Sequence, residues 1–218
     1  TLLRELRLHF PSTSVATTRH FDFLILGSGI AGLTFALQVA PRGRVAIVTK
    51  KSRADSNTNW AQGGIAAVTS REDSVEMHVR DTLEAGAGLC REDIVRTIIA
   101  EGPARIQELM ELGTKFSERE LPDGNGKELD LTKEGGHSKR RVLHAKDATG
   151  REIMRAIIER ARGLDHLDFW PGTFSIDLLT HEGRCRGALV WSKTHGKTLV
   201  WARRTILATG GAGQLYRE

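Results

Sequence analysis

Hydrophobic and polar positions follow two different periods along the chain, and together these periods predict an α/β protein. A short apolar run at residues 21–26 ends at a glycine, which is typical of a buried parallel strand. Apolar residues at helical spacing follow over residues 30–40, and a second β-branched run covers residues 44–49. Strand, helix and strand within about 30 residues make a βαβ unit, so we predict a parallel sheet with a right-handed crossover.

Further elements are predicted by the pattern after residue 72. Helical spacing returns over residues 74–85, 92–112 and 149–161, and Thr149 and Glu152 have the spacing of a capping box. Strand-like runs at residues 167–170, 175–180, 187–192 and 198–201 predict a small antiparallel meander, and residues 204–208 predict a last strand. The polar stretches 50–72 and 117–141 are predicted as loops, and a loop as long as the second is usually functional or disordered.

The predicted fold is therefore an α/β, Rossmann-like domain with a parallel sheet, crossover helices and a small antiparallel meander. We place this domain at residues 21–218. Residues 1–20 are rich in arginine, serine and threonine, and we expect them to form a disordered N-terminal extension.

Residues 27–32 read Gly-Ser-Gly-Ile-Ala-Gly, which is a GxGxxG pattern between a predicted strand and a predicted helix. In such a turn Gly27 permits the tight bend, Gly29 lets a pyrophosphate approach the backbone, and Gly32 lets helix and strand pack closely. The phosphates lie at the helix N-terminus, where free N–H groups and the helix dipole favour anions. The pattern in this context predicts a dinucleotide site.

The end of the second predicted strand departs from the pattern of NAD-binding domains. An acidic residue is expected there to bind a ribose hydroxyl, but the sequence reads Thr49-Lys50-Lys51. A cation at this place suits the 2′-phosphate of NADP, and it equally suits the adenosine or phosphates of FAD. The pattern leaves both possibilities open.

Two more segments have a composition suited to ligand binding. Residues 57–67 place a glycine pair beside amide and hydroxyl side chains, which can bring backbone donors near a flat polar ring; the alternative is a plain surface loop. Residues 132–144 combine Glu134 with His137, His144 and a basic run at residues 139–141. This set can bind a zwitterionic or dicarboxylic substrate, and the alternative is a solvated charged loop.

Composition excludes several classes of protein. Of the 218 residues, 39% are hydrophobic and 27% are charged, which is ordinary for a globular protein, and no stretch has the roughly 18–20 apolar residues of a membrane span. The net charge of +5 is mild and the 6% of aromatic residues do not interleave with basic ones, which argues against nucleic-acid binding. Cys90 and Cys185 have no metal or redox spacing.

The segments taken together resemble the flavoproteins of the succinate dehydrogenase and fumarate reductase superfamily, and within it the aspartate oxidases. The resemblance runs from Phe21 to Tyr216 through FLILGSGIAGL, VTK, NTNWAQGGIAAV, DTLEAGAGLC, LTKEGGHSKRRVLHAKDATGRE and ILATGGAG. The AQGGIAAV and T-x-EGGHS-x-RR segments are specific to this group, whereas the GxGxxG pattern is not.

The resemblance implies that the cofactor is FAD. Its pyrophosphate would lie at residues 28–31, its flavin along residues 57–64 and its adenine side near residues 174–175, with residues 209–211 closing the site. Lys50 takes the usual acidic position, as in other members of the family. The residues implied to bind FAD are Gly27, Ser28, Gly29, Ile30, Ala31, Gly32, Lys50, Asn57, Thr58, Asn59, Trp60, Ala61, Gln62, Gly63, Gly64, Phe174, Ser175, Thr209 and Gly210.

Two positions distinguish branches of the superfamily. Respiratory members carry a flavin-linking histidine where this chain has Asn57, so the resemblance implies non-covalent FAD. Glu134 stands where aspartate oxidases resemble one another and dicarboxylate reductases differ. A carboxylate there can pair with the α-ammonium of an amino acid, and it would repel succinate, which has no ammonium.

The implied activity is the FAD-dependent oxidation of L-aspartate to iminoaspartate, with electrons passed to oxygen or fumarate. This is the first step of NAD biosynthesis through quinolinate, which implies a cytoplasmic location and a possible partner enzyme from that pathway. The protein would bind only small-molecule substrates, with no membrane or nucleic-acid partner.

Members of the family are much longer than 218 residues, and the resemblance places their proton-transfer arginine and carboxylate-clamping residues beyond Glu218. We therefore assign no catalytic residue here and expect these 218 residues alone to be inactive and to bind FAD weakly or to fold poorly. Three alternatives stay open: a fragment of a fumarate reductase or succinate dehydrogenase flavoprotein, a non-enzymatic truncated FAD-binding module, and an NADP-binding reductase suggested by Lys50, Lys51 and Arg53.

Overall fold

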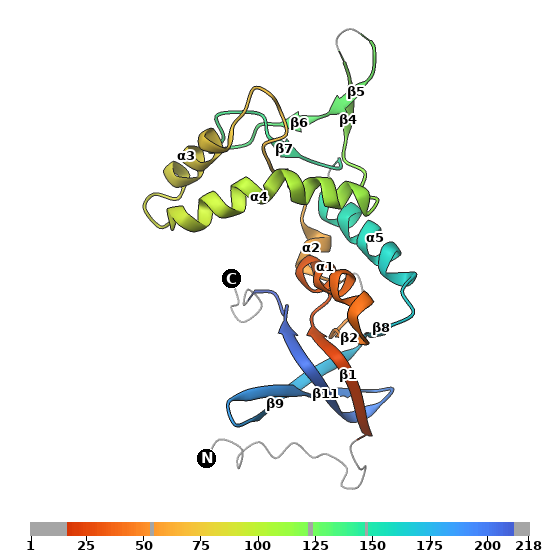
Figure 1. The fold of residues 1–218 in the computed structure, drawn as a ribbon. Coiled ribbons are helices and arrows are strands. Elements are labelled where there is room, and N and C mark those ends of the chain that lie inside the picture. The colour runs from red at the N-terminus through yellow and green to blue at the C-terminus, as the bar shows by residue number, and fades with distance from the viewer. Residues whose placement is uncertain (1–16, 53–54, 122–123, 147, 212–218) are drawn as a thin grey trace.

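A computed structural model describes residues 17–52, 55–121, 124–146 and 148–211 of the chain. Its main sheet has six strands in the order β8-β2-β1-β11-β10-β9, in which the pairs β8–β2, β2–β1 and β1–β11 are parallel and the pairs β11–β10 and β10–β9 are antiparallel (Figure 1). The strands are β1 (Thr17–Leu26), β2 (Val45–Val48), β8 (Leu167–Trp170), β9 (Thr173–His181), β10 (Arg184–Ser192) and β11 (Gly196–Leu207). The predicted α/β class with an antiparallel meander is confirmed.

Two details of the sheet differ from the prediction. Strand β8 pairs in parallel with β2, so residues 167–170 belong to the parallel part of the sheet and not to the meander. The predicted strands at residues 198–201 and 204–208 are one continuous strand, because β11 pairs with β1 from Thr17↔Thr198 to Leu26↔Leu207. For the same reason β1 begins at Thr17, within the predicted extension, whereas residues 1–16 lie outside the described part.

The predicted domain boundary at Glu218 also lies outside the described part. The last described residue is Gly211, so the structure follows the domain from β1 to the Thr209-Gly210-Gly211 segment after β11. Tyr216, where the family resemblance ends, belongs with Glu218 to the residues that are not described. The end of the domain therefore stays a prediction.

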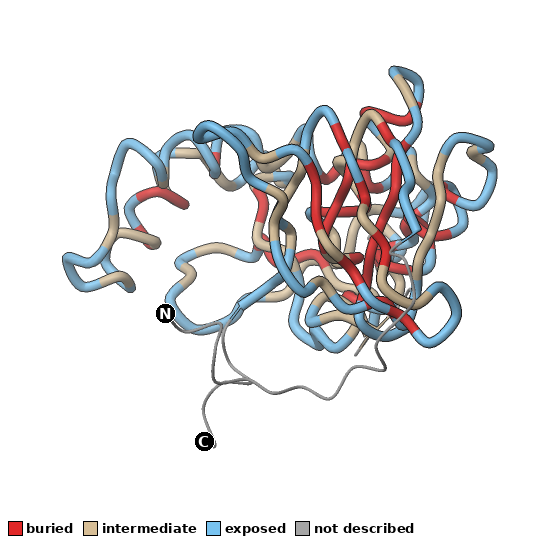
Figure 2. The backbone as a smooth tube through the Cα atoms, turned by 90° about the horizontal axis from the view of Figure 1, so that it is seen from below, coloured by how far each residue is buried: buried red, intermediate tan, exposed pale blue. Residues whose placement is uncertain are grey.

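Alternate residues of the central strands are buried on opposite faces of the sheet. Ile25 and Ile47 pack with α1 (Ile30–Val39) and α5 (Thr149–Arg162), whereas Leu24, Ala46 and Val200 pack on the other face. Burial on both faces explains why these strands are continuous apolar runs. The buried residues gather along these strands (Figure 2).

A second layer of elements lies on the side of α5 that faces away from the main sheet (Figure 1). It contains two packed helices, a three-stranded sheet in the order β3-β7-β6 and the hairpin β4–β5. Its elements are β3 (Ile65–Ala66), α3 (Val75–Ala85), α4 (Glu92–Glu111), β4 (Glu118–Glu120), β5 (Lys127–Leu129), β6 (Leu131–Thr132) and β7 (Val142–Leu143). The short helix α2 (Asn57–Trp60) lies outside this layer, next to α1 and packed against α5, and η2 (Ala40–Arg42) follows α1.

The predicted loop at residues 117–141 is therefore partly strand. The strands β4, β5 and β6 have two or three residues each, and every residue of β4 is exposed. Strands this short and this exposed bury too few residues to leave a period of two in the sequence.

The predicted capping box at α5 is wrong. The helix begins at Thr149 itself, with Ala148 at the N-cap and no side-chain cap. The Thr149 hydroxyl accepts a hydrogen bond from the Ala145 N–H at 3.1 Å, and Glu152 accepts one from the Lys115 N–H at 2.9 Å. Both side chains bind neighbouring loops and not the free N–H groups of their own helix.

Cys90 and Cys185 are free and partly buried. Within the described residues, no group of three or more potential metal ligands occurs. No helix in that part of the chain is long and apolar enough to cross a membrane.

Replacement of Gly27 with alanine tests the packing at the end of β1. Gly27 has a φ of 117°, and a Cβ there would lie 2.1 Å from the Ala208 carbonyl oxygen. We expect Gly27→Ala to lower the free energy of unfolding by about 1–3 kcal/mol in urea unfolding followed by circular dichroism. Gly63→Ala is the control, because a Cβ at Gly63 meets nothing within 4 Å. Equal stability of the two variants would contradict this account.

Candidate functional site

The turn between β1 and α1 is built by backbone contacts that leave no space for side chains. The Gly27 N–H donates to the Val48 carbonyl at 2.8 Å, and a Cβ on Gly32 would lie 2.2 Å from the Gly27 carbonyl oxygen. Gly29 is different, since the nearest atom to a Cβ there would be the Thr58 Oγ1 at 3.6 Å. The turn is closed around Gly27 and Gly32, whereas a Cβ on Gly29 would make only ordinary van der Waals contacts with Thr58 and Ser56.

The N-terminus of α1 carries an uncompensated positive end. Gly29 occupies the N-cap without a side-chain cap, and the first turn of this helix contains no acidic residue. The Ile30 N–H donates to the Thr58 hydroxyl at 3.2 Å, and Ala31 is exposed. A helix start of this kind favours a phosphate group, because both the N–H groups and the dipole attract an anion.

Helix α2 and the end of β11 meet beside this turn. Ser56 caps α2 by accepting from the Asn59 N–H at 3.3 Å. A Cβ on Gly210 would lie 3.8 Å from the Asn57 amide nitrogen, and Ala208 contacts Gly27. Residues 57–58, 208–210 and 27–30 are therefore brought together, as the sequence predicts for one site.

Gly150 holds α2 in place and was not identified from the sequence. A Cβ on Gly150 would lie 1.7 Å from the Thr58 carbonyl oxygen, and the Gly150 N–H donates to the Ala61 carbonyl at 3.0 Å. The signal was present in the DATGRE segment, where a glycine is unusual in the first turn of a helix.

The residues predicted for the adenine side lie at the end of β2. The Ser28 hydroxyl donates to the Thr49 Oγ1 at 3.0 Å, and the Thr173 N–H donates to the Thr49 carbonyl at 3.0 Å. Lys50 is exposed at this end, and Phe174 and Ser175 continue from Thr173 along β9. The site thus lies at the carboxyl ends of parallel strands, where open α/β sheets bind ligands.

Residues 60–64 form an exposed connection from α2 to β3. Trp60 is 69% exposed. A Cβ on Gly64 would lie 2.2 Å from the Leu143 carbonyl oxygen, so this glycine allows the connection to pass close to β7, whereas Gly63 faces open space. An exposed indole beside a free glycine backbone is a surface that a flat ring can contact.

Glu134 lies apart from this cluster, in the loop after β6. Its carboxylate is exposed, and its carbonyl accepts a hydrogen bond from the His137 N–H at 3.3 Å. A Cβ on Gly136, two residues on, would lie 3.4 Å from the Ala85 Cβ at the end of α3. The loop therefore packs against α3, and His144 lies elsewhere, with its Nε2 3.4 Å from an Asp130 carboxylate oxygen.

A cluster of ionic and hydrogen-bonded side chains around the buried Arg141 joins this loop to α3, and we name it the Arg141 cluster: Asp73, Asp81, His137, Ser138 and Arg141. The guanidinium donates twice to Asp73, at 2.8 Å each, and once to Asp81 at 2.6 Å. Asp81 also accepts from the Ser138 N–H at 2.8 Å and the Ser138 hydroxyl at 2.7 Å. The side chains of Arg141 and Asp73 are 0% and 1% exposed.

The solvated-loop interpretation is therefore wrong for Arg141. Its partners Asp73 and Asp81 lie 68 and 60 residues away in the sequence, and no local pattern connects them. The only signal in the sequence was a pair of aspartates eight residues apart: Asp73 directly precedes the predicted helix at residues 74–85, and Asp81 lies within it. Because helix faces carry charges for many reasons, that signal does not identify a buried pair.

The electrostatics of the cluster shift the pKa of Asp81 and that of His78, which lies beside it. Burial raises the pKa of Asp81, but the two Ser138 donors and the Arg141 guanidinium outweigh burial and hold the pKa well below its usual range. Burial and the Arg141 charge lower the pKa of His78, whose ring stacks edge-on against His137 at 5.6 Å. These shifts favour an ionised Asp81 and a neutral His78.

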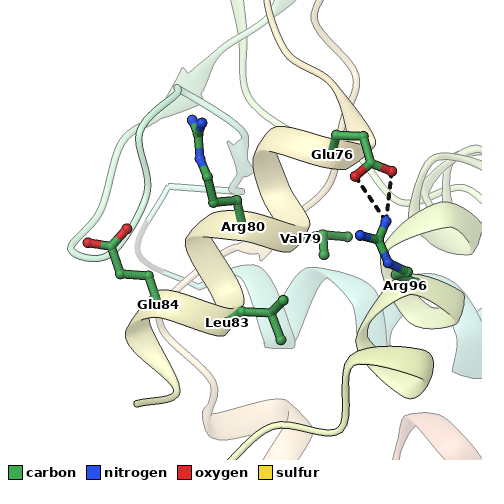
Figure 3. A pocket seen from close by; sticks show the side chains of 6 residues that line it. All are labelled: Glu76, Val79, Arg80, Leu83, Glu84 and Arg96. Atoms are coloured by element: carbon green, nitrogen blue, oxygen red, sulfur yellow. Dashed lines mark hydrogen bonds and ion pairs between the residues drawn. The ribbon is translucent and has the colours of Figure 1, made fainter. Parts of the chain in front are cut away.

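Two hollows in the described structure lie away from the glycine turn. One of about 490 Å³ separates α3 from α4, and there Arg96 spans the gap to donate twice to Glu76, at 2.7 and 2.9 Å (Figure 3). The other, of about 700 Å³, is lined by Asp22, Arg44 and Arg186 among others, near the amino ends of the parallel strands. Neither brings together the residues predicted from the sequence.

Comparisons with known proteins identify the family. A family model described as an FAD binding domain matches residues 22–218. The chloroplastic L-aspartate oxidase of Arabidopsis thaliana is 46% identical over 206 residues, which are 92% of this chain and 31% of that protein. The L-aspartate oxidase of Pseudomonas aeruginosa is 41% identical over 204 residues, which are 89% of this chain and 38% of that protein. The chain spans about a third of the length of these curated relatives.

Solved structures show the same fold. A variant of the E. coli quinol fumarate reductase superposes with a TM-score of 0.84 at 30% identity, covering 92% of this chain and 34% of that chain. The Mycobacterium smegmatis Sdh1 complex gives 0.80 at 29% identity, covering 92% of this chain and 36% of that chain.

The expected position of the catalytic arginine stays a prediction. The resemblance places the proton-transfer arginine of the family beyond Glu218, and Glu218 itself lies outside the described residues. The described residues therefore include a candidate cofactor site and Glu134, and we assign no catalytic acid or base among them.

Acid should weaken the fold through Asp81. Its native pKa lies below the unfolded value of about 3.9, so its stabilisation is complete above that pH and is lost as the pH falls further. We expect the free energy of unfolding of Asp81→Asn, measured in urea, to fall less steeply than wild type between about pH 5 and pH 3. Asp165→Asn, at an exposed aspartate, is the control with the wild-type slope. If the stability of Asp81→Asn fell with pH as steeply as that of wild type, the Arg141 cluster would not lower the pKa of Asp81.

Proposed function

The chain belongs to the FAD binding domain family, and we propose that it is the FAD-binding part of an enzyme that oxidises L-aspartate to iminoaspartate. The proposal is supported by the curated relatives at 41–46% identity, which are L-aspartate oxidases. The structures of the E. coli fumarate reductase and the Mycobacterium smegmatis Sdh1 complex are 30% and 29% identical, so a flavoprotein of the fumarate reductase or succinate dehydrogenase type is the weaker alternative.

The described residues fit FAD. The observation that carries this is the N-terminus of α1, which has Gly29 at the N-cap and no acidic residue in its first turn, at the point where the ends of β1, β2 and β11 meet α2. Backbone N–H groups of residues 28–31 would hold the pyrophosphate, and Lys50 with the backbone of residues 174–175 would hold the adenosine. Residues 57–64 would contact the flavin, and Thr209 and Gly210 would close the site.

Two finer features belong to the same proposal. FAD would be bound without a covalent link, because the Asn57 amide has no nucleophilic nitrogen. NADP is disfavoured for two reasons: Lys51 is paired with Asp55 at 3.2 Å, and the matching family model describes an FAD binding domain. The third cation of that alternative, Arg53, lies outside the described residues. When bound, FAD supplies the electron acceptor for the substrate's Cα–H bond.

The substrate side of the proposal rests on Glu134. Its exposed carboxylate would pair with the α-ammonium of L-aspartate, and the electrons would then pass to oxygen or fumarate. The reaction would be the first step of NAD biosynthesis through quinolinate. It would take place in the cytoplasm, together with a partner enzyme of that pathway. Plant relatives are named as chloroplastic, so the compartment stays a prediction.

A charge at the N-cap of α1 tests the cofactor site. Gly29→Asp should fold, because an added Cβ would lie at an ordinary contact distance of 3.6 Å from the Thr58 Oγ1 and aspartate is a good N-cap, yet its carboxylate should repel the pyrophosphate. We expect at least about ten-fold weaker FAD binding by flavin fluorescence titration than for Gly29→Asn, the neutral variant of the same shape. Equal affinities would place the phosphates elsewhere.

Removal of the Glu134 charge tests the substrate. In the longer enzyme that contains this chain, we expect Glu134→Gln to lower kcat/KM for L-aspartate by about 10- to 100-fold, because a charge-assisted contact of roughly 1.5–3 kcal/mol is lost. Glu118→Gln, at an exposed residue of β4, is the control and should not change the value. Unchanged aspartate turnover in Glu134→Gln would refute the ammonium contact.

A further inference from the structure

The loop that carries Glu134 has little of its own to hold it in place. Gly135 and Gly136 follow the glutamate directly, and Gly136 has a φ of 80°. Within the loop, the backbone bond that involves Glu134 is the one from the His137 N–H at 3.3 Å. An exposed carboxylate beside two glycines would adopt many positions unless the next residues were fixed.

The next residues are fixed by the Arg141 cluster. Asp81 on α3 accepts from both donors of Ser138, and it shares the Arg141 guanidinium with Asp73, which directly precedes the N-cap of α3. Because Arg141 is also tied to the backbone, by its N–H to the Thr132 carbonyl at 3.2 Å, the cluster holds both ends of the loop. The side chains of Asp73, Asp81, Ser138 and Arg141 thus fix residues 137–141 against α3.

The imidazole of His137 is oriented by the same guanidinium. Its Nδ1 lies 3.2 Å from the Arg141 Nη1. An arginine N–H can only donate, so a hydrogen bond here requires Nδ1 to be the acceptor. In the neutral ring this bond corresponds to the Nε2–H tautomer, so the tautomer of His137 is a reporter of the Arg141 contact.

A cluster of this kind is expensive to bury, and apolar residues of the same volume often give equal or greater stability. Its advantage is a fixed geometry, since a bidentate guanidinium pair allows few arrangements. The position of Glu134 needs such a geometry, because a misplacement of about 1 Å in a substrate-positioning group can lower the rate by about 100-fold.

We propose that Arg141 is a positioning residue for Glu134: through Asp73, Asp81, Ser138 and His137 it fixes the loop so that the Glu134 carboxylate meets the ammonium group of the substrate. The inference rests on the proposed function, because it assigns Arg141 a role in the selection of an amino acid over a dicarboxylate without an ammonium group. Arg141 itself is fully buried, so its effect on the substrate would be exerted through Glu134.

The first test is spectroscopic and uses the 218-residue chain. Nitrogen NMR of the histidine rings distinguishes a proton on Nε2 from one on Nδ1. We expect the Nε2–H tautomer for His137 in wild type and in Arg140→Lys, at an exposed arginine, and a mixture of tautomers in Arg141→Lys. An unchanged tautomer in Arg141→Lys would overturn the contact on which the proposal depends.

The second test is kinetic and uses the longer enzyme. Arg141→Lys keeps the charge but loses the planar fork, so we expect KM for L-aspartate to rise by about ten-fold and KM for fumarate as electron acceptor to stay within about two-fold of wild type. Since Arg141 acts through Glu134, Arg141→Lys should have no further effect on aspartate in a Glu134→Gln background. Arg140→Lys is again the control.

The outcomes separate a positioning role from a structural one. Equal losses for aspartate and fumarate, or additive effects of Arg141→Lys and Glu134→Gln, would overturn the proposal and leave Arg141 as a stabilising residue. If Glu134→Gln alone left aspartate turnover unchanged, the proposed role of Glu134 itself would be refuted. The two outcomes named before would refute only the role of Arg141. If Arg141→Lys fails to fold, Ser138→Ala keeps all charges and removes one bond to Asp81, and it should raise KM for aspartate selectively by a smaller factor.

Discussion

The close backbone contact at the end of β1 is the constraint on which the candidate site depends. Gly27 lies against the Ala208 carbonyl and Gly32 lies against the Gly27 carbonyl, so β1, α1 and β11 meet at distances that side chains would prevent. The start of α1 consequently faces the ends of β2 and β11, and Thr58 reaches it from α2. The fold thereby presents a positive helix end, without a charge of its own to neutralise it, at the carboxyl edge of a parallel sheet.

A second constraint joins this cofactor region to the loop of Glu134. Gly150 brings α2 onto α5, and Gly64 brings the connection after α2 onto β7, which pairs with β6 next to Glu134. The Arg141 cluster then fixes the loop against α3. The proposed flavin segment and the proposed substrate residue are thus linked through short strands and two close glycine contacts, and not through a single rigid helix.

Much of the first region was predictable because its determinants are local. The apolar run at residues 21–26, the glycine spacing at residues 27–32 and the helical period after it lie within one βαβ unit, and β1, α1 and β2 follow that pattern. The pairing of β8 with β2 was not predictable, because a four-residue apolar run fits a meander or a parallel edge equally well. Arg141 was misjudged for a related reason: its partners Asp73 and Asp81 are distant in sequence, and a run of basic residues at 139–141 does not show which of them is buried. Gly150 escaped prediction because its contacts with Thr58 and Ala61 are tertiary, whereas strands β4 and β5 escaped prediction because they have only three residues each.

The most direct test of the account is a parallel titration of the purified chain with FAD and with NADPH, followed by flavin and tryptophan fluorescence. The account predicts saturable binding of FAD with a lower Kd than that of NADPH, even if the absolute affinity is weak. Tighter binding of NADPH, or no saturable binding of FAD by the folded chain, would contradict the assignment of the glycine turn and its neighbours as an FAD site.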